Sequence, residues 1–147
     1  MQFDEMKHSV TELPFNSFLG LESCRDGELL LRLPAGDQYL NHLGTVHASA
    51  LLSLAEAASG ECLLQHFGTS DGVVPVVRRL EAKFRKPANG VVGAKASLSE
   101  ERVTQLKGNL AAKGRAVVTV QVELYDMTDS HVLSATVEWF VAAEVGR

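Results

Sequence analysis

Hydrophobic and polar positions alternate along four segments in the second half of the chain, and this pattern predicts four β-strands. Each segment carries apolar side chains at every second position, with mostly polar or small side chains between them. A period of two is typical of a strand that buries one face in an antiparallel sheet. The four segments are residues 73–86, 92–99, 118–125 and 133–141. A further alternating segment, residues 28–33, follows the turn signal Asp26-Gly27.

A long segment with helical character, residues 41–60, precedes these four strands. Most of the helix circumference is apolar, which is typical of a buried helix, and we expect its end near residues 66–68 with Gly68 as the cap. The apolar positions are Leu51, Leu52, Leu54, Ala55, Ala58 and Leu63. One line down the helix forms a narrow polar stripe, which consists of Ser49, Ser53, Glu56 and Gly60.

Shorter elements complete the predicted layout. Residues 1–13 are expected to form a short amphipathic helix that Pro14 ends, and a loop over residues 14–22 follows. Residues 100–113 carry apolar side chains at helical spacing and predict a helical insert between two strands. Residues 125–130 make the last turn. The order of elements predicts one α+β domain over residues 1–147, in which one antiparallel sheet packs on one helix.

The predicted central helix has more apolar surface than one sheet can cover. Another cover is therefore needed, and a second copy of the chain is the simplest one. We expect a homodimer or a dimer of dimers.

Composition and charge exclude several classes of protein. The 147 residues are 46% hydrophobic and 22% charged, as in ordinary soluble globular domains, and the net charge of −4 argues against a dedicated nucleic-acid binder. Cys24 and Cys62 lack the spacing of a disulfide framework or a zinc site. The N-terminus lacks the apolar core of a signal peptide, and the apolar run over residues 43–55 is too short to span a bilayer. We expect a cytoplasmic protein with no membrane partner, no metal and no cofactor.

A motif at the start of the predicted helix carries a family resemblance. Asn41, Gly44 and His47 are spaced as Asn-x-x-Gly-x-x-His, and Glu56 follows His47 by nine residues in a Leu-Ala-Glu context. Together with the order of one strand, one helix and four strands, this resembles the hotdog-fold acyl-CoA thioesterases. The closest likeness is to the phenylacetic-acid-degradation (PaaI-like) group, which shows N-x-x-G-x-x-H-G-G and an acidic residue nine positions after the histidine.

The resemblance extends over most of the chain, from about residue 14 to residue 141. Residues 84–90 are similar to a family strand that ends in proline and glycine, and residues 113–117 and 123–126 are similar to its penultimate strand. The resemblance implies the hotdog fold, an antiparallel β-sheet wrapped around a long central helix. It also implies an acyl-CoA thioesterase that hydrolyses a thioester to a free acid and coenzyme A.

One departure from the family motif concerns catalysis directly. The two glycines that follow the histidine in the family are Ala48-Ser49 in this chain. The family uses a backbone N–H at this helix N-terminus to form the oxyanion hole, and Ala48 and Ser49 retain such groups. A methyl and a hydroxymethyl group now stand where the thioester approaches.

The resemblance implies that Glu56 is the general base or the nucleophile of hydrolysis. Burial in an apolar helix raises the pKa of a carboxyl group and makes it a better base than an exposed one. The alternative is a structural Glu56 that forms a buried or interfacial salt bridge with Arg78 or Arg79. Arg78 is expected to share the apolar strand face of Leu80 and Ala82 and to pair with a carboxylate such as Glu56 or Glu61.

The other motif residues have alternative roles. Asn41 orients the carboxylate, a water or the substrate carbonyl, or it caps the turn before the helix. Gly44 supplies a backbone conformation that other residues avoid, with any oxyanion role secondary. His47 positions the loop or lies near the thioester. Ser49 and Ser53 bind the carboxylate or substrate, or bond back to the preceding helical turn.

Coenzyme A carries phosphates, so its site requires cations at its mouth. The candidates are Lys83, Arg85, Lys86, Lys113 and Arg115. Arg115 is the first choice, because it follows Gly114 at a strand start; each of these side chains is equally compatible with a solvated outer strand face.

Two other functions remain open. A non-catalytic acyl-CoA-binding module is the main alternative, because Ala48-Ser49 replaces Gly-Gly. A hotdog dehydratase ranks below both, because its histidine context has no match in this chain. The identity of the acyl group is not encoded in a recognisable motif.

Overall fold

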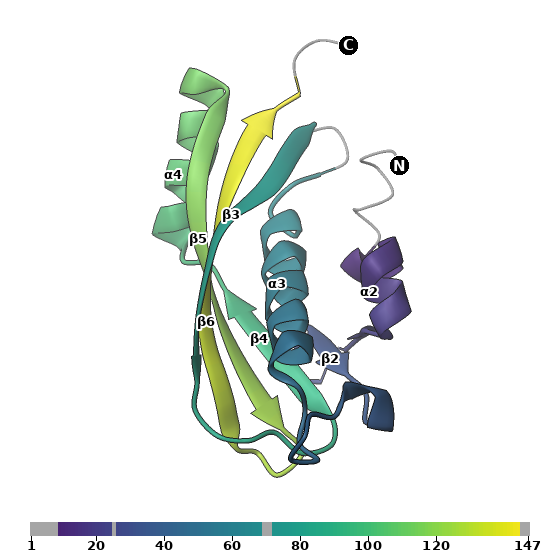
Figure 1. Cartoon of the computed structure of the whole chain (residues 1–147). Coiled ribbons are helices and arrows are strands. Elements are labelled where there is room, and N and C mark those ends of the chain that lie inside the picture. The colour runs from purple at the N-terminus through teal and green to yellow at the C-terminus, as the bar shows by residue number, and fades with distance from the viewer. Residues whose placement is uncertain (1–8, 25, 69–71, 145–147) are drawn as a thin grey trace.

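Six strands in the described part of the chain form one antiparallel sheet that curves around a long helix (Figure 1). The structure is a computed structural model, and it describes residues 9–24, 26–68 and 72–144. The strands are β1 (Glu22–Ser23), β2 (Leu31–Leu33), β3 (Val73–Phe84), β4 (Val92–Ser97), β5 (Arg115–Asp126) and β6 (His131–Ala143). They pair in the order β1-β2-β4-β5-β6-β3, so β3 lies at one edge of the sheet.

The central helix is α3 (Ala48–Leu64), which lies on the inner face of the sheet. The helix α2 (Pro14–Leu19) and the 3-10 turn η1 (Val10–Glu12) pack on the side of α3 that faces away from the sheet (Figure 1). The helix α4 (Glu100–Lys113) lies beside the first half of β5, and the 3-10 turn η2 (Asp37–Tyr39) precedes the loop to α3. This arrangement confirms the predicted α+β class.

The core forms where the alternating faces of the strands meet α3. The even positions from 116 to 124 in β5 and the odd positions from 133 to 141 in β6 are buried, as their period of two predicts. Trp139 of β6 donates from Nε1 to Ser59 Oγ at 3.0 Å, and its ring packs over Gly60 of α3. Gly60 therefore faces the core and does not continue the polar stripe of the helix.

The helical insert over residues 100–113 is confirmed as α4. Ser99 accepts a hydrogen bond from the Arg102 N–H at 3.2 Å and caps the start of the helix. Gly114 ends it with φ of 74°, a conformation that favours glycine. Leu106 is buried, so the insert contributes to the core.

The N-terminal prediction was wrong at Pro14. The helix α2 begins at this residue, because a first helical position needs no N–H partner and the fixed φ of proline suits it. Residues 14–22, expected as a loop, contain α2 and the start of β1. Most of the helix expected over residues 1–13 lies outside the described residues.

Two element boundaries also differ from expectation. The strand predicted over residues 28–33 is regular only over Leu31–Leu33, after the turn that contains Asp26-Gly27. The helix α3 ends at Leu64 with Gln65 as its cap, so Gly68 is not the capping residue.

Candidate active site at the start of the central helix

The Asn41 side chain builds the turn that leads into α3. Its Oδ1 accepts from the Leu43 N–H at 2.9 Å and the Thr45 N–H at 3.1 Å, and its Nδ2 donates to Thr45 Oγ1 at 3.0 Å. Gly44 within this turn has φ of 75°, a value that side-chain-bearing residues rarely adopt. The Asn41 side-chain oxygen and nitrogen both form hydrogen bonds within the turn. This geometry fits the expected role of Asn41 in capping the turn before the helix.

Backbone hydrogen bonds on two sides hold the segment just before the helix. The Val46 N–H donates to Ala88 O at 2.9 Å, and the His47 N–H donates to Tyr39 O at 2.7 Å. His47 is the N-cap residue with φ −62° and ψ 140°, and its Nδ1 accepts from the Ser49 N–H at 3.0 Å. The histidine ring therefore caps the helix locally.

Capping leaves one backbone donor at the N-terminus of α3. His47 Nδ1 takes the Ser49 N–H, and His47 O takes the N–H groups of Ala50 at 3.0 Å and Leu51 at 3.2 Å. The Ala48 N–H makes no hydrogen bond within the described chain, and Ala48 is exposed. An exposed, unpaired N–H at the positive end of a helix suits an oxyanion.

Glu56 is half-buried and lies on a face of α3 where Ser49 is exposed and Leu52 and Ser53 are half-buried, which we call the open face of α3. Burial raises the pKa of its carboxyl group above the ordinary value for glutamate. Within the described residues, its carboxylate makes no hydrogen bond or ion pair. An unpaired, partly desolvated carboxylate is costly for stability and is typical of functional sites.

Within one chain, the Ala48 N–H and the Glu56 carboxylate do not face a common point. Residue 56 lies roughly 12 Å further along the helix axis, at ~1.5 Å per residue. The free N–H groups of a helix point out of its N-terminus, away from the later turns. A carbonyl bound to the Ala48 N–H is therefore beyond the reach of Glu56 in the same chain.

The serines of the polar stripe make no hydrogen bond to the Glu56 carboxylate. Ser53 Oγ donates to Ser49 O at 2.9 Å, which is the backward bond that helical serines commonly make. Ser49 is exposed, and Leu52 and Ser53 are half-buried beside Glu56. The open face of α3 thus combines small polar and apolar groups around one carboxylate.

The salt-bridge alternative for Glu56 does not form within the described residues. The pairing of β3 with β6 shifts between Val77 and Arg79, so Arg78 occupies a bulge. Arg78 is exposed, so the expectation that it shares the apolar face was wrong, and within the described chain it forms no ion pair with Glu56 or Glu61. A bulge reverses the alternation of side chains, and the period-of-two pattern gave no sign of it.

The candidate coenzyme A cations fall into two groups at opposite ends of the sheet. Lys83, Arg85 and Lys86 lie near the end of β3, whereas Lys113 and Arg115 lie at the start of β5, and all five are exposed. Arg115 pairs with Ala142 of β6, and the Arg85 N–H bonds to Val132 O. These β6 positions are about 30 Å apart at ~3.3 Å per residue. The two groups cannot bind the same phosphate within one chain.

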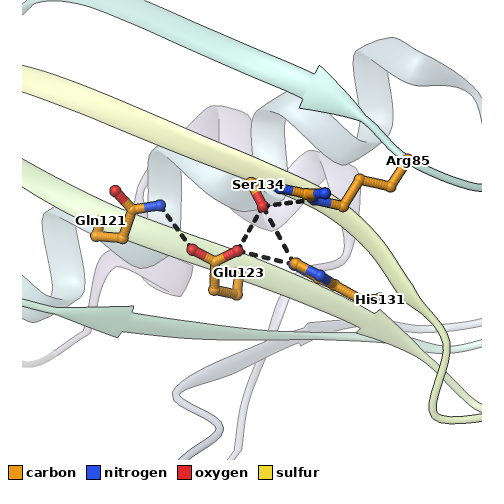
Figure 2. Close-up of polar contacts among 5 residues, drawn as sticks. All are labelled: Arg85, Gln121, Glu123, His131 and Ser134. Carbon is orange, nitrogen blue, oxygen red and sulfur yellow. Dashed lines mark hydrogen bonds and ion pairs between the residues drawn. The ribbon is translucent and has the colours of Figure 1, made fainter.

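A polar cluster that the sequence reasoning missed lies on the outer face of the sheet (Figure 2). Glu123 accepts from Ser134 Oγ at 2.6 Å and from Gln121 Nε2 at 2.6 Å, and it contacts His131 Nε2 at 2.8 Å. Burial raises the pKa of Glu123, but the hydrogen bonds from Ser134, Gln121 and His131 outweigh it, and the net pKa is lowered. The only sequence signal was a polar residue at alternate positions of β5 and β6.

This cluster contains a serine, a histidine and a glutamate, but their geometry is not that of a catalytic triad. Ser134 Oγ and Glu123 both contact Nε2 of His131, at 3.2 and 2.8 Å. A triad requires the acid and the serine on different ring nitrogens, so that the acid orients the base. Arg85 Nε also donates to Ser134 Oγ at 2.8 Å. The cluster is a polar network on the sheet surface.

Metal and membrane sites were searched over the described ranges. There, no three His, Cys, Asp or Glu side chains gather in a way that could hold a metal ion. No helix in the same ranges is long and apolar enough to cross a membrane.

A family model matches residues 18–141, which include α3, β1 to β5 and most of β6. The chain belongs to this family, the domain of unknown function DUF4442. The match includes the Asn41 turn, the N-terminus of α3 and Glu56, so the candidate site lies within the DUF4442 domain. No curated protein matches the chain.

Solved structures similar to this DUF4442 chain include proteins of the thioesterase superfamily. A Pseudomonas aeruginosa protein of unknown function, PA5026, described as a probable thioesterase, is 26% identical with a TM-score of 0.79, over 98% of this chain and 97% of its own. The Haemophilus influenzae thioesterase HI1161 is 16% identical with a TM-score of 0.69, over 100% and 94%. The Bacillus halodurans protein BH2602, solved with CoA, is 24% identical with a TM-score of 0.67, over 86% and 74%. The predicted hotdog fold of the thioesterase superfamily is confirmed, and the PaaI-like subgroup stays a prediction.

The raised pKa of Glu56 predicts a pH-dependent gain in stability when the carboxylate is removed. A carboxyl group whose pKa is raised in the folded state favours folding below its unfolded pKa of about 4.3, and this contribution is lost as pH rises through the folded pKa. Glu56→Gln should therefore melt at a higher temperature than the wild type at pH 8. The melting temperature should rise by roughly 2–4 °C for each kcal/mol gained in the free energy of unfolding, and the two proteins should melt alike at pH 4.

Thermal melts of the wild type and Glu56→Gln at pH 4 and pH 8 measure this effect. An equal difference at both pH values, or a destabilised variant at pH 8, would show that burial does not disfavour the charged carboxylate.

Proposed function

We propose that this protein is a thioesterase that hydrolyses acyl-CoA to a free acid and coenzyme A. The observation that carries the proposal is Glu56, a half-buried carboxylate with a raised pKa and no partner in the described chain, on the open face of α3. A general base works best when its pKa lies close to the operating pH. The similarity to HI1161, a thioesterase, and to BH2602, solved with CoA, supports the same reaction class.

In the proposed mechanism, Glu56 acts as a general base or as a nucleophile. As a base, it takes a proton from water while the water oxygen bonds to the thioester carbonyl carbon. The carbonyl oxygen becomes an oxyanion that accepts a hydrogen bond from the Ala48 N–H at the positive end of a helix. The tetrahedral intermediate then collapses, the C–S bond breaks, and the thiolate takes the proton from Glu56. As a nucleophile, Glu56 bonds to the carbonyl carbon, the C–S bond breaks and coenzyme A leaves as the thiolate, which leaves an acyl anhydride on Glu56. Water then hydrolyses this anhydride to the free acid and the Glu56 carboxylate, and the remaining proton of the water passes to the thiolate.

We propose that a complete site needs two chains. The separation of the Ala48 N–H and Glu56 within one chain favours a site that takes the N–H from one copy and the carboxylate from the other. The edge strand β3 supports this arrangement, because its outer N–H and C=O groups are unpaired by the sheet and its Val76 and Phe84 are 54% and 49% exposed. A twofold pairing of β3 edges joins the sheets and brings two α3 helices side by side.

The dimer proposal predicts a solution mass of two 15.9-kDa chains, or of four for a dimer of dimers, measured by light scattering at micromolar concentration. Val76→Lys on β3 should give a folded monomer without hydrolysis, because an edge lysine opposes strand pairing. Val117→Lys on β5 is the matched control, since Val117 is 45% exposed but lies away from the edge. A wild-type monomer that hydrolyses acyl-CoA would contradict the proposal.

A non-catalytic acyl-CoA-binding module is the second candidate function. It is favoured by Ala48-Ser49 in place of two glycines and by the capture of the Ser49 N–H by His47, which leaves one oxyanion donor. A thiol-release assay over short, medium, long and aryl acyl-CoAs separates the two. Release of thiol supports the enzyme, whereas calorimetric binding without release supports the module. Alanine variants of Lys83 and Arg115 in the same assay identify which cationic end binds the coenzyme A phosphates.

A further inference from the structure

The turn between β5 and β6 contains a buried carboxylate that the proposed hydrolysis does not use. Asp126 is 7% exposed and accepts four hydrogen bonds. Its Oδ1 accepts from the Thr128 N–H at 2.9 Å, Thr128 Oγ1 at 2.7 Å and the Ser130 N–H at 3.2 Å. Its Oδ2 accepts from the Asn89 N–H at 3.2 Å. The two oxygens thus join two separate segments, the β5–β6 turn and the β3–β4 loop.

The Asn89 contact leads directly to the start of α3. Ala88, the residue before Asn89, is 1% exposed and accepts the Val46 N–H at 2.9 Å. Val46 is followed by His47, the N-cap residue whose φ and ψ fix the direction in which the helix begins. Asp126 therefore holds the peptide that holds Val46, and Ala48 lies two residues further along the chain.

A second contact joins the same turn and loop. Gly90 has φ of 71° and lies against the Met127 side chain so closely that a Cβ on Gly90 would overlap the Met127 sulfur. The loop over residues 88–90 is thus held by the hydrogen bond at Asn89, and the exposed Met127 side chain lies beside Gly90. Both contacts come from the adjacent residues Asp126 and Met127.

We infer that Asp126 is a positioning residue for the Ala48 N–H, acting through Asn89, Ala88 and Val46. The inference rests on the proposed function, in which this N–H binds the oxyanion. Electrostatic stabilisation of an oxyanion depends on a donor that is already in place, and a shift of about 1 Å in such a site costs up to ~10²-fold in rate.

The carboxylate is charged under the conditions in which hydrolysis would be measured. Burial raises the pKa of Asp126, but the hydrogen bonds from Thr128, Asn89 and Ser130 outweigh it, and the net pKa is lowered below the ordinary aspartate value. A charged acceptor makes a stronger hydrogen bond to a backbone N–H than a neutral one.

Asp126→Asn tests the inference, with Thr128→Val as the matched control. The amide keeps the volume of the side chain but has one acceptor oxygen, which three hydrogen bonds hold toward Thr128 and Ser130. Its NH2 group then faces the Asn89 N–H, and that contact is lost. Thr128→Val removes the two hydrogen bonds of Thr128 Oγ1, to Asp126 Oδ1 and to Ser130 Oγ, and leaves the Asn89 contact intact.

Two measurements are made on both variants and the wild type. Amide hydrogen exchange at Val46, followed by NMR, should accelerate roughly tenfold in Asp126→Asn and stay within about twofold of the wild type in Thr128→Val. Thiol release should show kcat lowered by about tenfold to 10²-fold in Asp126→Asn, with KM within about twofold and no such loss in Thr128→Val.

The outcomes separate this inference from the proposed function. Unchanged Val46 exchange in Asp126→Asn, or equal acceleration in both variants, overturns the positioning role whether or not the protein releases thiol. Accelerated exchange with wild-type kcat overturns it as well, because the start of the helix would then have no effect on the reaction. A wild type that releases no thiol contradicts the proposed hydrolysis. The positioning role of Asp126 is judged independently, from the exchange rate of the Val46 N–H.

Discussion

Glu56→Gln is expected to reduce kcat for acyl-CoA hydrolysis by about 10²–10⁴-fold, the usual contribution of a general base. The amide has nearly the same shape as the carboxylate but neither accepts a proton from water nor attacks a carbonyl carbon. Because the Glu56 carboxylate has no hydrogen bond or ion pair in the described chain, its replacement breaks no contact there. The variant should therefore lose activity without losing stability, as measured by thiol release and thermal melting.

Glu61→Gln is the matched control for this substitution. Glu61 lies on the same helix, and its Oε1 accepts from the Val10 N–H at 3.2 Å. A glutamine oxygen can accept the same bond, so Glu61→Gln should keep wild-type kcat. Hydrolysis that survives in Glu56→Gln would remove Glu56 from the mechanism and would favour another base.

Ala48→Pro is expected to reduce kcat by about 10²–10³-fold, the cost of losing one oxyanion donor. Proline has no N–H, and Ala48 is the first residue of α3, the position that proline prefers in helices. The residue before it, His47, has φ −62° and ψ 140°, which the residue before a proline adopts without strain. The substitution thus removes the one free N–H and retains the helix.

Ala48→Val controls for the added bulk of the proline ring, because it is larger than alanine and keeps the N–H. Circular dichroism should show the same helix content in the wild type and both variants. Thiol release should separate them, with Ala48→Pro more strongly impaired than Ala48→Val, because only the proline lacks the N–H. Equal rates in all three proteins would place the oxyanion away from the Ala48 N–H.

Local patterns predicted most of the regular elements. The period of two in β5 and β6 identified their buried faces, because a strand with one face in the core must alternate. Helical spacing identified α4, and Ser99 and Gly114 are residues that favour its two ends. The prediction that Pro14 ends a helix was wrong. Proline can end a preceding helix or begin a following one, and the sequence pattern did not distinguish these two cases.

Part of the candidate site was also local. The Asn41 turn, the positive φ of Gly44 and the capping by His47 all involve residues within a few positions of one another, so the motif spacing contained them. Glu56 stood out as a carboxylate in the middle of the apolar run of the helix, and its raised pKa follows from its burial there. The capture of the Ser49 N–H by His47 depends on a side-chain rotamer, which spacing alone does not fix.

The remaining features were decided by tertiary structure, because they depend on pairings between residues far apart in the sequence. Strand order made β3 an edge, and the register of β3 against β6 produced the bulge that exposes Arg78. The pairings of β3 and of β5 with β6 placed Arg85 and Arg115 at opposite ends of the sheet. The sequence by itself determined the helix, its carboxylate and the strands around it. Only the folded chain brought Asp126 to Asn89, and through it to the start of α3, since such contacts form between segments whose local patterns contain no information about each other.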